Sequence, residues 1–117
     1  MPVVASAVGG LLTLVDHGES GFLVPDRDPV EFARYLDALL DDMLAIRELE
    51  EMIVRLRSGG YDALPGYDYR GPTHVSIGQE ASAVGVCSCL RKDDYLTTTH
   101  RGHGHMIAKG ADLEDGG

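Results

Sequence analysis

The chain has 117 residues, 44% of them apolar, which is the length and composition of one small globular domain. Its 19 acidic and 10 basic residues give a net charge of -9. This balance argues against nucleic-acid binding, which requires a basic surface, and against attraction to anionic lipid. The apolar runs fall short of the ~20 residues of a membrane-spanning helix, and the first residues lack the basic flank of a secretion signal. We therefore expect a cytoplasmic protein that contacts neither nucleic acid nor membrane.

The first 25 residues predict two short strands. Residues 2–6 form a β-branched run that a glycine pair ends, as expected for a buried strand followed by a tight loop. Residues 11–15 are apolar, and their periodicity does not decide between helix and strand. Residues 16–21 have the composition of a turn, and a second strand is expected at residues 21–24.

A long helix is expected at about residues 29–57. Asp28 is a good N-cap, Pro29 suits the first helical position, and Glu31 stands where a capping box places its acid. Apolar residues then recur three and four positions apart as far as Leu56, which predicts one amphipathic rod of roughly 40 Å. The pattern leaves open a kink near Asp41-Asp42. The acidic pairs at 41–42 and 50–51 are interpreted as solvated helix faces.

The C-terminal half predicts shorter elements. The prolines, tyrosines and glycines of residues 61–72 indicate a loop. Ser76 and Gln79 have the spacing of a capping box, which predicts a second helix at about residues 77–90. A strand is expected at 95–98, a glycine-histidine loop at 100–105, and one helical turn at 106–109. The expected fold class is therefore α/β and incomplete, with two or three short strands, one long helix and one of medium length.

The first 42 residues resemble the C-terminal nucleotide-sugar domain of GT-B glycosyltransferases. The stretches that carry the resemblance are 2–6 (PVVAS), Gly9-Gly10, Asp16, Gly18, 21–25 (GFLVP) and Asp28-Pro29. In that family the glycine pair forms a loop near the donor diphosphate. Leu12-Thr13 replaces the family's Pro-Glu, and the family's donor-binding motif lies upstream of the matching stretch. We therefore expect a domain fragment at 1–42 without glycosyltransferase activity.

Residues 43–117 resemble the alpha subunit of thiamine-diphosphate-dependent 2-oxo acid dehydrogenases of the pyruvate, branched-chain and acetoin types. The stretches that carry this resemblance are 43–51 (MLAIRELEE), 71–81 (GPTHVSIGQEA), 94–105 (DYLTTTHRGHGH) and 108–110 (AKG). The family decarboxylates a 2-oxo acid on thiamine diphosphate, held with magnesium, and passes the acyl group to a lipoyl-bearing acyltransferase. The resemblance thus implies an oxidoreductase fragment whose partners are a dehydrogenase beta subunit and that acyltransferase.

The resemblance also implies roles for particular residues. Arg101 is the candidate for gripping the cofactor diphosphate, because a guanidinium binds phosphate oxygens in a bidentate manner. His100 takes the position beside the cofactor, so both residues are expected to bind it. His74 is the catalytic candidate, placed where an imidazole donates a hydrogen bond or moves a proton near the reacting carbonyl. His103 and His105 are expected to line or support the same loop.

Plainer interpretations remain open for these residues. Arg101 could pair with a carboxylate, and His74 could be a loop histidine bonded to backbone. A metal cluster of His100, His103 and His105 is disfavoured, since a glycine-rich loop lacks a rigid element to fix the geometry. No metal site is therefore expected.

Structural roles are expected for three further polar residues. Glu80 is interpreted as a first-turn acid that suits the helix dipole. Cys87 and Cys89 are interpreted as small buried residues of a reducing compartment.

The expected site is incomplete. The family holds magnesium and diphosphate through a downstream Gly-Asp-Gly…Asn segment that this sequence does not contain. The carboxylate that activates the aminopyrimidine ring comes from the beta subunit. We therefore expect a truncated fusion that is inactive and binds no cofactor alone. Two alternatives are a glycosyltransferase fragment and a non-enzymatic helical module that self-associates.

Overall fold

The computed structural model describes residues 3–7, 11–19, 21–25, 28–59, 66 and 71–111. Its elements, in chain order, are β1 (Val4–Ser6), α1 (Leu11–Leu14), β2 (Phe22–Val24), α2 (Pro29–Ser58), α3 (Glu80–Cys87) and α4 (His103–Ala108). Two short strands, one long helix and several short helices confirm the expected α/β class. The predicted Gly9-Gly10 loop, most of the predicted loop at 61–72 and the chain end at 112–117 lie outside the described residues.

The two strands form a parallel pair, in which Val4 lies opposite Phe22 and Ser6 opposite Val24. Parallel strands need a crossover connection, and α1 lies within it, so residues 11–14 of the ambiguous run at 11–15 are helical. Gly21 permits the close approach of the strands, because a Cβ there would meet the Val3 carbonyl oxygen at 2.5 Å. Both strands were therefore correctly predicted from the sequence.

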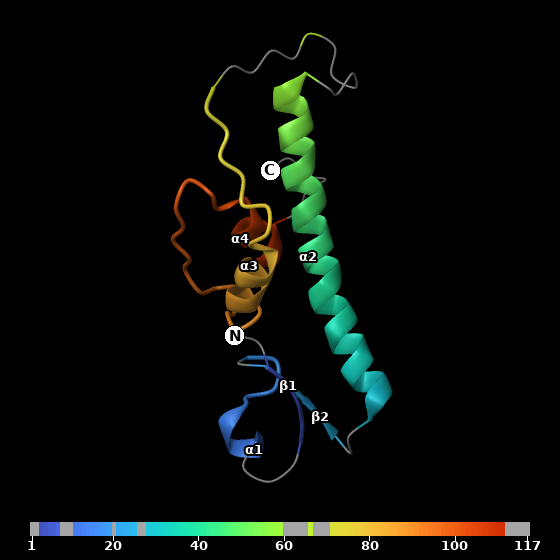
Figure 1. Ribbon diagram of the computed structural model, residues 1–117. Coiled ribbons are helices and arrows are strands. Elements are labelled where there is room, and N and C mark those ends of the chain that lie inside the picture. The colour runs from blue at the N-terminus through green and yellow to red at the C-terminus, as the bar shows by residue number, and fades with distance from the viewer. Residues whose placement is uncertain are drawn as a thin grey trace.

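Helix α2 runs without a break through residues 41–42, as one rod of about 45 Å (Figure 1). Asp28 caps it, since its carboxylate accepts the N–H of Val30 at 2.8 Å. Gly59 ends it in the left-handed conformation, at φ 72°. The expected capping box does not form, because Glu31 instead pairs with Arg34 at 2.8 Å.

Helices α3 and α4 lie side by side against the middle of α2 (Figure 1). The core where the three helices meet consists of Ile46, Ala83 and Val84, all nearly inaccessible to solvent. Gly104 brings α4 close to this core, because a Cβ there would lie 3.0 Å from the Ile46 side chain.

The second predicted helix is shorter than expected at both ends. Gly78 has φ 92°, a left-handed conformation that a helix does not accommodate, so α3 begins only at Glu80. Ser76 is not its N-cap, since the Ser76 hydroxyl donates to the carbonyl of Arg101 at 3.2 Å. After Cys87 the chain continues in turns rather than in helix.

The predicted strand at 95–98 is absent, because no strand among the described residues lies beside it to complete a ladder. The expected glycine-histidine loop also ends early. His103 and His105 belong to the first turn of α4, so a rigid element orients both side chains.

The N-terminal half of α2 contacts the two strands. Phe22 of β2 stacks on Tyr35 of α2 with the ring centroids 4.3 Å apart, and His17 meets both rings edge-on. The molecule is elongated, measuring 59 × 29 × 25 Å. Within the described ranges, no helix combines the length and apolar character that a membrane span requires.

Candidate functional site

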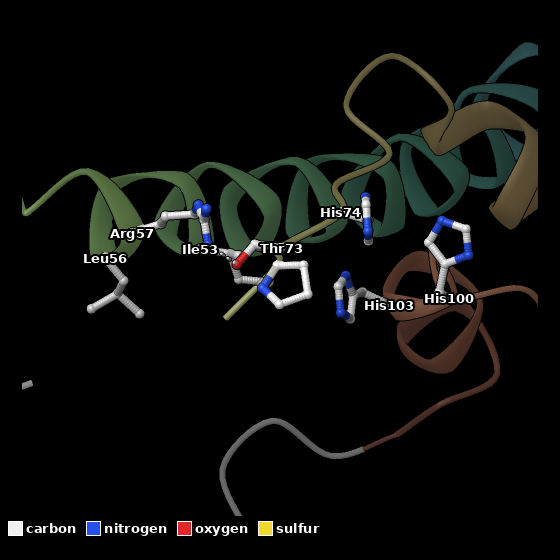
Figure 2. A pocket seen from close by; sticks show the side chains of 8 residues that line it. Ile53, Leu56, Arg57, Thr73, His74, His100 and His103 are labelled. Carbon is white, nitrogen blue, oxygen red and sulfur yellow. Dashed lines mark hydrogen bonds between the residues drawn. The ribbon is translucent and has the colours of Figure 1, made fainter. Parts of the chain in front are cut away.

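A cavity of about 400 Å³ lies between the C-terminal half of α2, the segment before α3 and the start of α4 (Figure 2). Side chains from these three regions line it: Ile53, Leu56, Arg57, Pro72, Thr73, His74, His100 and His103. The lining combines an apolar wall from α2 with imidazoles and a guanidinium. Such a lining suits a small organic ligand that carries negative charge.

Two of the sequence-predicted residues meet in this cavity. The rings of His74 and His100 pack edge-on, with their centroids 4.5 Å apart. They come from segments 26 positions apart in the chain, and Figure 2 shows both beside His103. The fold therefore brings together the catalytic candidate and one of the cofactor-binding candidates.

Arg101 lies next to His100 in the chain, but it lines a second cavity, of about 240 Å³. Its Nη1 donates to the carbonyl of Val75 at 3.0 Å. The carbonyl of Arg101 in turn accepts the hydroxyl of Ser76 at 3.2 Å. These two bonds tie the segment that carries His74 to the segment that carries His100, and the guanidinium bonds to backbone rather than to a described carboxylate.

Glu50 is a member of this site that the sequence interpretation missed. We expected it on a solvated helix face, whereas its side chain is 0% exposed. One carboxylate oxygen accepts the N–H of Ser76 at 2.9 Å, and the other lies 3.3 Å from Nδ1 of His103. The available signal was its spacing, four residues after Ile46 and three before Ile53, which places it on the apolar stripe.

Arg57 is a second residue that the sequence interpretation missed. It stands at the end of α2 and lines the cavity. Its guanidinium donates to the carbonyl of Gly71 and lies 3.5 Å from the hydroxyl of Thr73. It therefore brings positive charge to the wall and holds the segment that leads to His74.

Glu80 was correctly expected in the first turn of its helix. It forms an ion pair with Arg47 of α2 at 2.5 Å and accepts the N–H of Gly78 at 3.0 Å. The hydrogen bond from Arg47 lowers the pKa of Glu80 to about 2, helped by the Gly78 N–H and opposed by burial. The pair joins α3 to α2, which is a structural role.

The two cysteines lie outside the cavity lining, and the described residues show no metal site. Cys87 is buried, and burial raises the pKa of its thiol. Cys89 is only partly buried, and neither cysteine is in a disulfide: the Cys87 thiol donates to the carbonyl of His105 and the Cys89 thiol to that of Gly85, both at 3.6 Å. In the part of the chain that the structure describes, no group of three histidine, cysteine or acidic side chains is arranged to hold a metal ion.

Comparison with protein families gives two separate matches. Residues 1–42 match the family described as glycosyl transferases group 1, and residues 66–115 match the dehydrogenase E1 component. Both resemblances seen in the sequence are thereby confirmed. No solved structure matches the chain significantly.

Individual relatives fall into the same two classes of protein. The chain is 49% identical over 72 residues to the acetoin:2,6-dichlorophenolindophenol oxidoreductase alpha subunit of Bacillus subtilis, covering 62% of the chain and 20% of the relative. It is 39% identical over 69 residues to the pyruvate dehydrogenase E1 alpha subunit of Rhizobium meliloti, covering 59% and 18%. It is also 62% identical over 39 residues to a D-inositol 3-phosphate glycosyltransferase of Frankia alni, covering 33% and 10%. The chain thus spans a fifth or less of the length of these relatives.

Proposed function

We propose that residues 43–117 supply one part of the thiamine diphosphate site of a 2-oxo acid or acetoin dehydrogenase alpha subunit. Residues 1–42 are then a separate glycosyltransferase-type fragment. The observation that carries this proposal is that His74, His100 and His103, from segments distant in the chain, line one cavity together with an apolar wall. The similarity of residues 66–115 to the dehydrogenase E1 component supports the same assignment.

The donor set fits one end of the cofactor. A diphosphate requires cationic or N–H donors, and two candidates are adjacent in the chain: His100 lines the first cavity and Arg101 the second. The Arg101 guanidinium has five N–H groups and uses one of them to bond the carbonyl of Val75. The other N–H groups can donate to phosphate oxygens. His74 would face the reacting carbonyl and donate a hydrogen bond or hold a proton there. Thiamine diphosphate, when bound, supplies the carbanion chemistry.

The remaining groups of such a site come from elsewhere. We propose that the magnesium ligands lie in another part of the alpha subunit and that a beta subunit supplies the carboxylate at the aminopyrimidine ring. A lipoyl-bearing acyltransferase would accept the acyl group. The 117-residue chain alone is therefore inactive under this proposal, and calorimetric titration with thiamine diphosphate and magnesium should give no heat.

The direct test restores the missing parts. Residues 43–111 replace the matching stretch of the full-length Bacillus subtilis acetoin alpha subunit, which is assembled with its own beta subunit. We expect this chimera to bind thiamine diphosphate and to turn over acetoin. Arg101→Ala should weaken cofactor binding by about tenfold or more, because a charge-assisted hydrogen bond contributes roughly 1.5–3 kcal/mol. His74→Ala should reduce turnover more than cofactor affinity.

The matched control is Arg91→Ala, which removes an exposed arginine that pairs with Asp94. It should leave cofactor affinity and turnover unchanged. The proposal fails if the unaltered chimera folds but binds no thiamine diphosphate. It also fails if the variants at Arg101 and Arg91 bind the cofactor equally well.

A further inference from the structure

The cavity contains an acid-histidine contact to which the proposed function assigns no role. Glu50, in the middle of α2, is fully buried, whereas the His103 side chain is 36% exposed and lines the cavity. The two residues are 53 positions apart in the chain, and their polar atoms are 3.3 Å apart. A buried carboxylate therefore stands directly behind a cavity-facing imidazole.

The Glu50 carboxylate is held so that only one oxygen can reach the ring. Oε2 accepts the N–H of Ser76 at 2.9 Å, and this bond fixes the rotation of the carboxylate. Oε1 is then left to face Nδ1 of His103. The backbone of the segment that follows His74 thus sets the direction in which Glu50 acts.

An ionised Glu50 determines where the His103 proton lies. The oxygens of an ionised carboxylate only accept hydrogen bonds, so Nδ1 then donates and carries a proton. In a neutral imidazole the other nitrogen, Nε2, is then unprotonated and holds its lone pair. Nε2 is the ring nitrogen that Glu50 does not contact, and the His103 side chain lines the cavity together with His74 and His100 (Figure 2).

We propose that Glu50 is a positioning residue that holds His103 in the Nδ1–H tautomer and so presents Nε2 as a proton acceptor in the cavity. A carboxylate that orients an imidazole in this way is a recurrent device for preparing a general base. The use of that base on a small carbonyl substrate rests on the proposed function. The tautomer and its cause do not, since they follow from the contacts of Glu50 alone.

The substitution Glu50→Gln tests the cause, because glutamine has one oxygen and one NH₂ group. The Ser76 N–H can only donate, so the glutamine oxygen must face it. The NH₂ group then faces Nδ1 of His103, which has to become the acceptor and pass its proton to Nε2. Glu51→Gln is the matched control, since Glu51 is adjacent, has a side chain that is 45% exposed, and pairs with Arg55.

The measurement is long-range ¹H–¹⁵N correlation spectroscopy of the whole 117-residue chain, in alkaline solution where an ordinary imidazole is neutral. We expect His103 to be mainly the Nδ1–H tautomer in the unaltered chain and in Glu51→Gln, and mainly the Nε2–H tautomer in Glu50→Gln. A His103 that is mainly Nε2–H in the unaltered chain overturns the proposal. So does a Glu50→Gln chain that keeps the Nδ1–H form. If Glu50→Gln does not fold, the spectrum of the unaltered chain decides alone.

These spectra require no cofactor, so they test the tautomer of His103 independently of the proposed dehydrogenase function. The chimera described above tests the chemical use of the base separately. There, Glu50→Gln should lower turnover by about tenfold or more and leave the affinity for thiamine diphosphate unchanged. Turnover equal to that of Glu51→Gln would overturn the role of His103 as the acceptor.

Discussion

The ion pair between Arg47 and Glu80 shows how single residues hold the site in place. Glu80 is nearly buried, and its pKa of about 2 lies well below that of an ordinary glutamate because Arg47 donates to it. A carboxyl whose pKa is lowered in the folded state stabilises that state above the unfolded pKa, and the stabilisation is lost as the pH falls toward 2. The shift corresponds to roughly 3 kcal/mol, and the 40% exposure of Arg47 reduces our expectation to about 2 kcal/mol.

Glu80→Gln should therefore lower the free energy of unfolding by about 2 kcal/mol at neutral pH. The difference from the unaltered chain should shrink between about pH 4.5 and pH 2, as Glu80 becomes protonated in both folded and unfolded chains. Urea unfolding at several pH values measures this. Glu48→Gln, at an exposed position of helix α2, is the control and should show almost no difference. If the difference in unfolding free energy between Glu80→Gln and the unaltered chain stays constant with pH, the stabilisation does not come from the ionised carboxylate of Glu80.

At the scale of elements, the contact between α4 and α2 depends on a residue without a side chain. Gly104 is buried, and an added Cβ would lie 3.0 Å from Cγ2 of Ile46 and 3.3 Å from Cβ of Ala83. Gly104→Ala should force the two helices apart and destabilise the chain by about 1–3 kcal/mol, as overpacking does in other cores. Urea unfolding would measure the loss.

Met106→Ala is the control for that change, because Met106 is on the same helix and is exposed. Its effect should stay within about 0.5 kcal/mol. Equal stability of the two variants would show that α4 does not pack as closely on Ile46 as the structure places it.

The elements that the sequence predicted correctly are those whose signals are local. Helix α2 begins and ends where its cap residues stand, because Asp28 and Gly59 act on their own turns of helix. The strand expected at 95–98 failed for the opposite reason, since β-branched residues do not supply a neighbouring strand. Glu50 was misjudged because its burial depends on α3 and α4, which come later in the chain and cover that face of α2.

The candidate site follows the same distinction. The histidine-rich stretch was recognisable by residue type, and His74 and His100 do meet in one cavity. The contact between Glu50 and His103 joins positions 53 residues apart, which no local pattern encodes. Sequence reasoning thus singled out histidines that line one cavity and missed the buried carboxylate that contacts one of them.

At the scale of the whole molecule, α2 links two parts that the family comparisons separate. The expected boundary between residues 42 and 43 falls inside this continuous helix (Figure 1). Its N-terminal end contacts β1 and β2, where Tyr35 stacks on Phe22, and from Leu39 onward it packs on the core shared with α3 and α4. We infer that the two parts share one rod but are stabilised by separate sets of contacts.

The aromatic contact between Tyr35 and Phe22 tests that inference, because it is far from α3 and α4 along α2. Tyr35→Ala removes the ring that stacks on Phe22 and the hydroxyl that lies 3.4 Å from Nε2 of His17. The amides of β2 should then exchange hydrogen about tenfold faster or more, since the strand loses its packing on the helix. The amides of α3 should keep their protection, because the core around Ile46 is untouched.

Hydrogen exchange read residue by residue separates the outcomes, with Tyr95→Ala as the control at a fully exposed tyrosine. Faster exchange confined to β2 means that the dehydrogenase-like part holds its cavity without help from the strands. In that case residues 1–28, which precede α2, could be exchanged without disturbing His74, His100 or His103. Loss of protection in both β2 and α3 would contradict the inference, because it would show that the rod transmits unfolding from one end to the other.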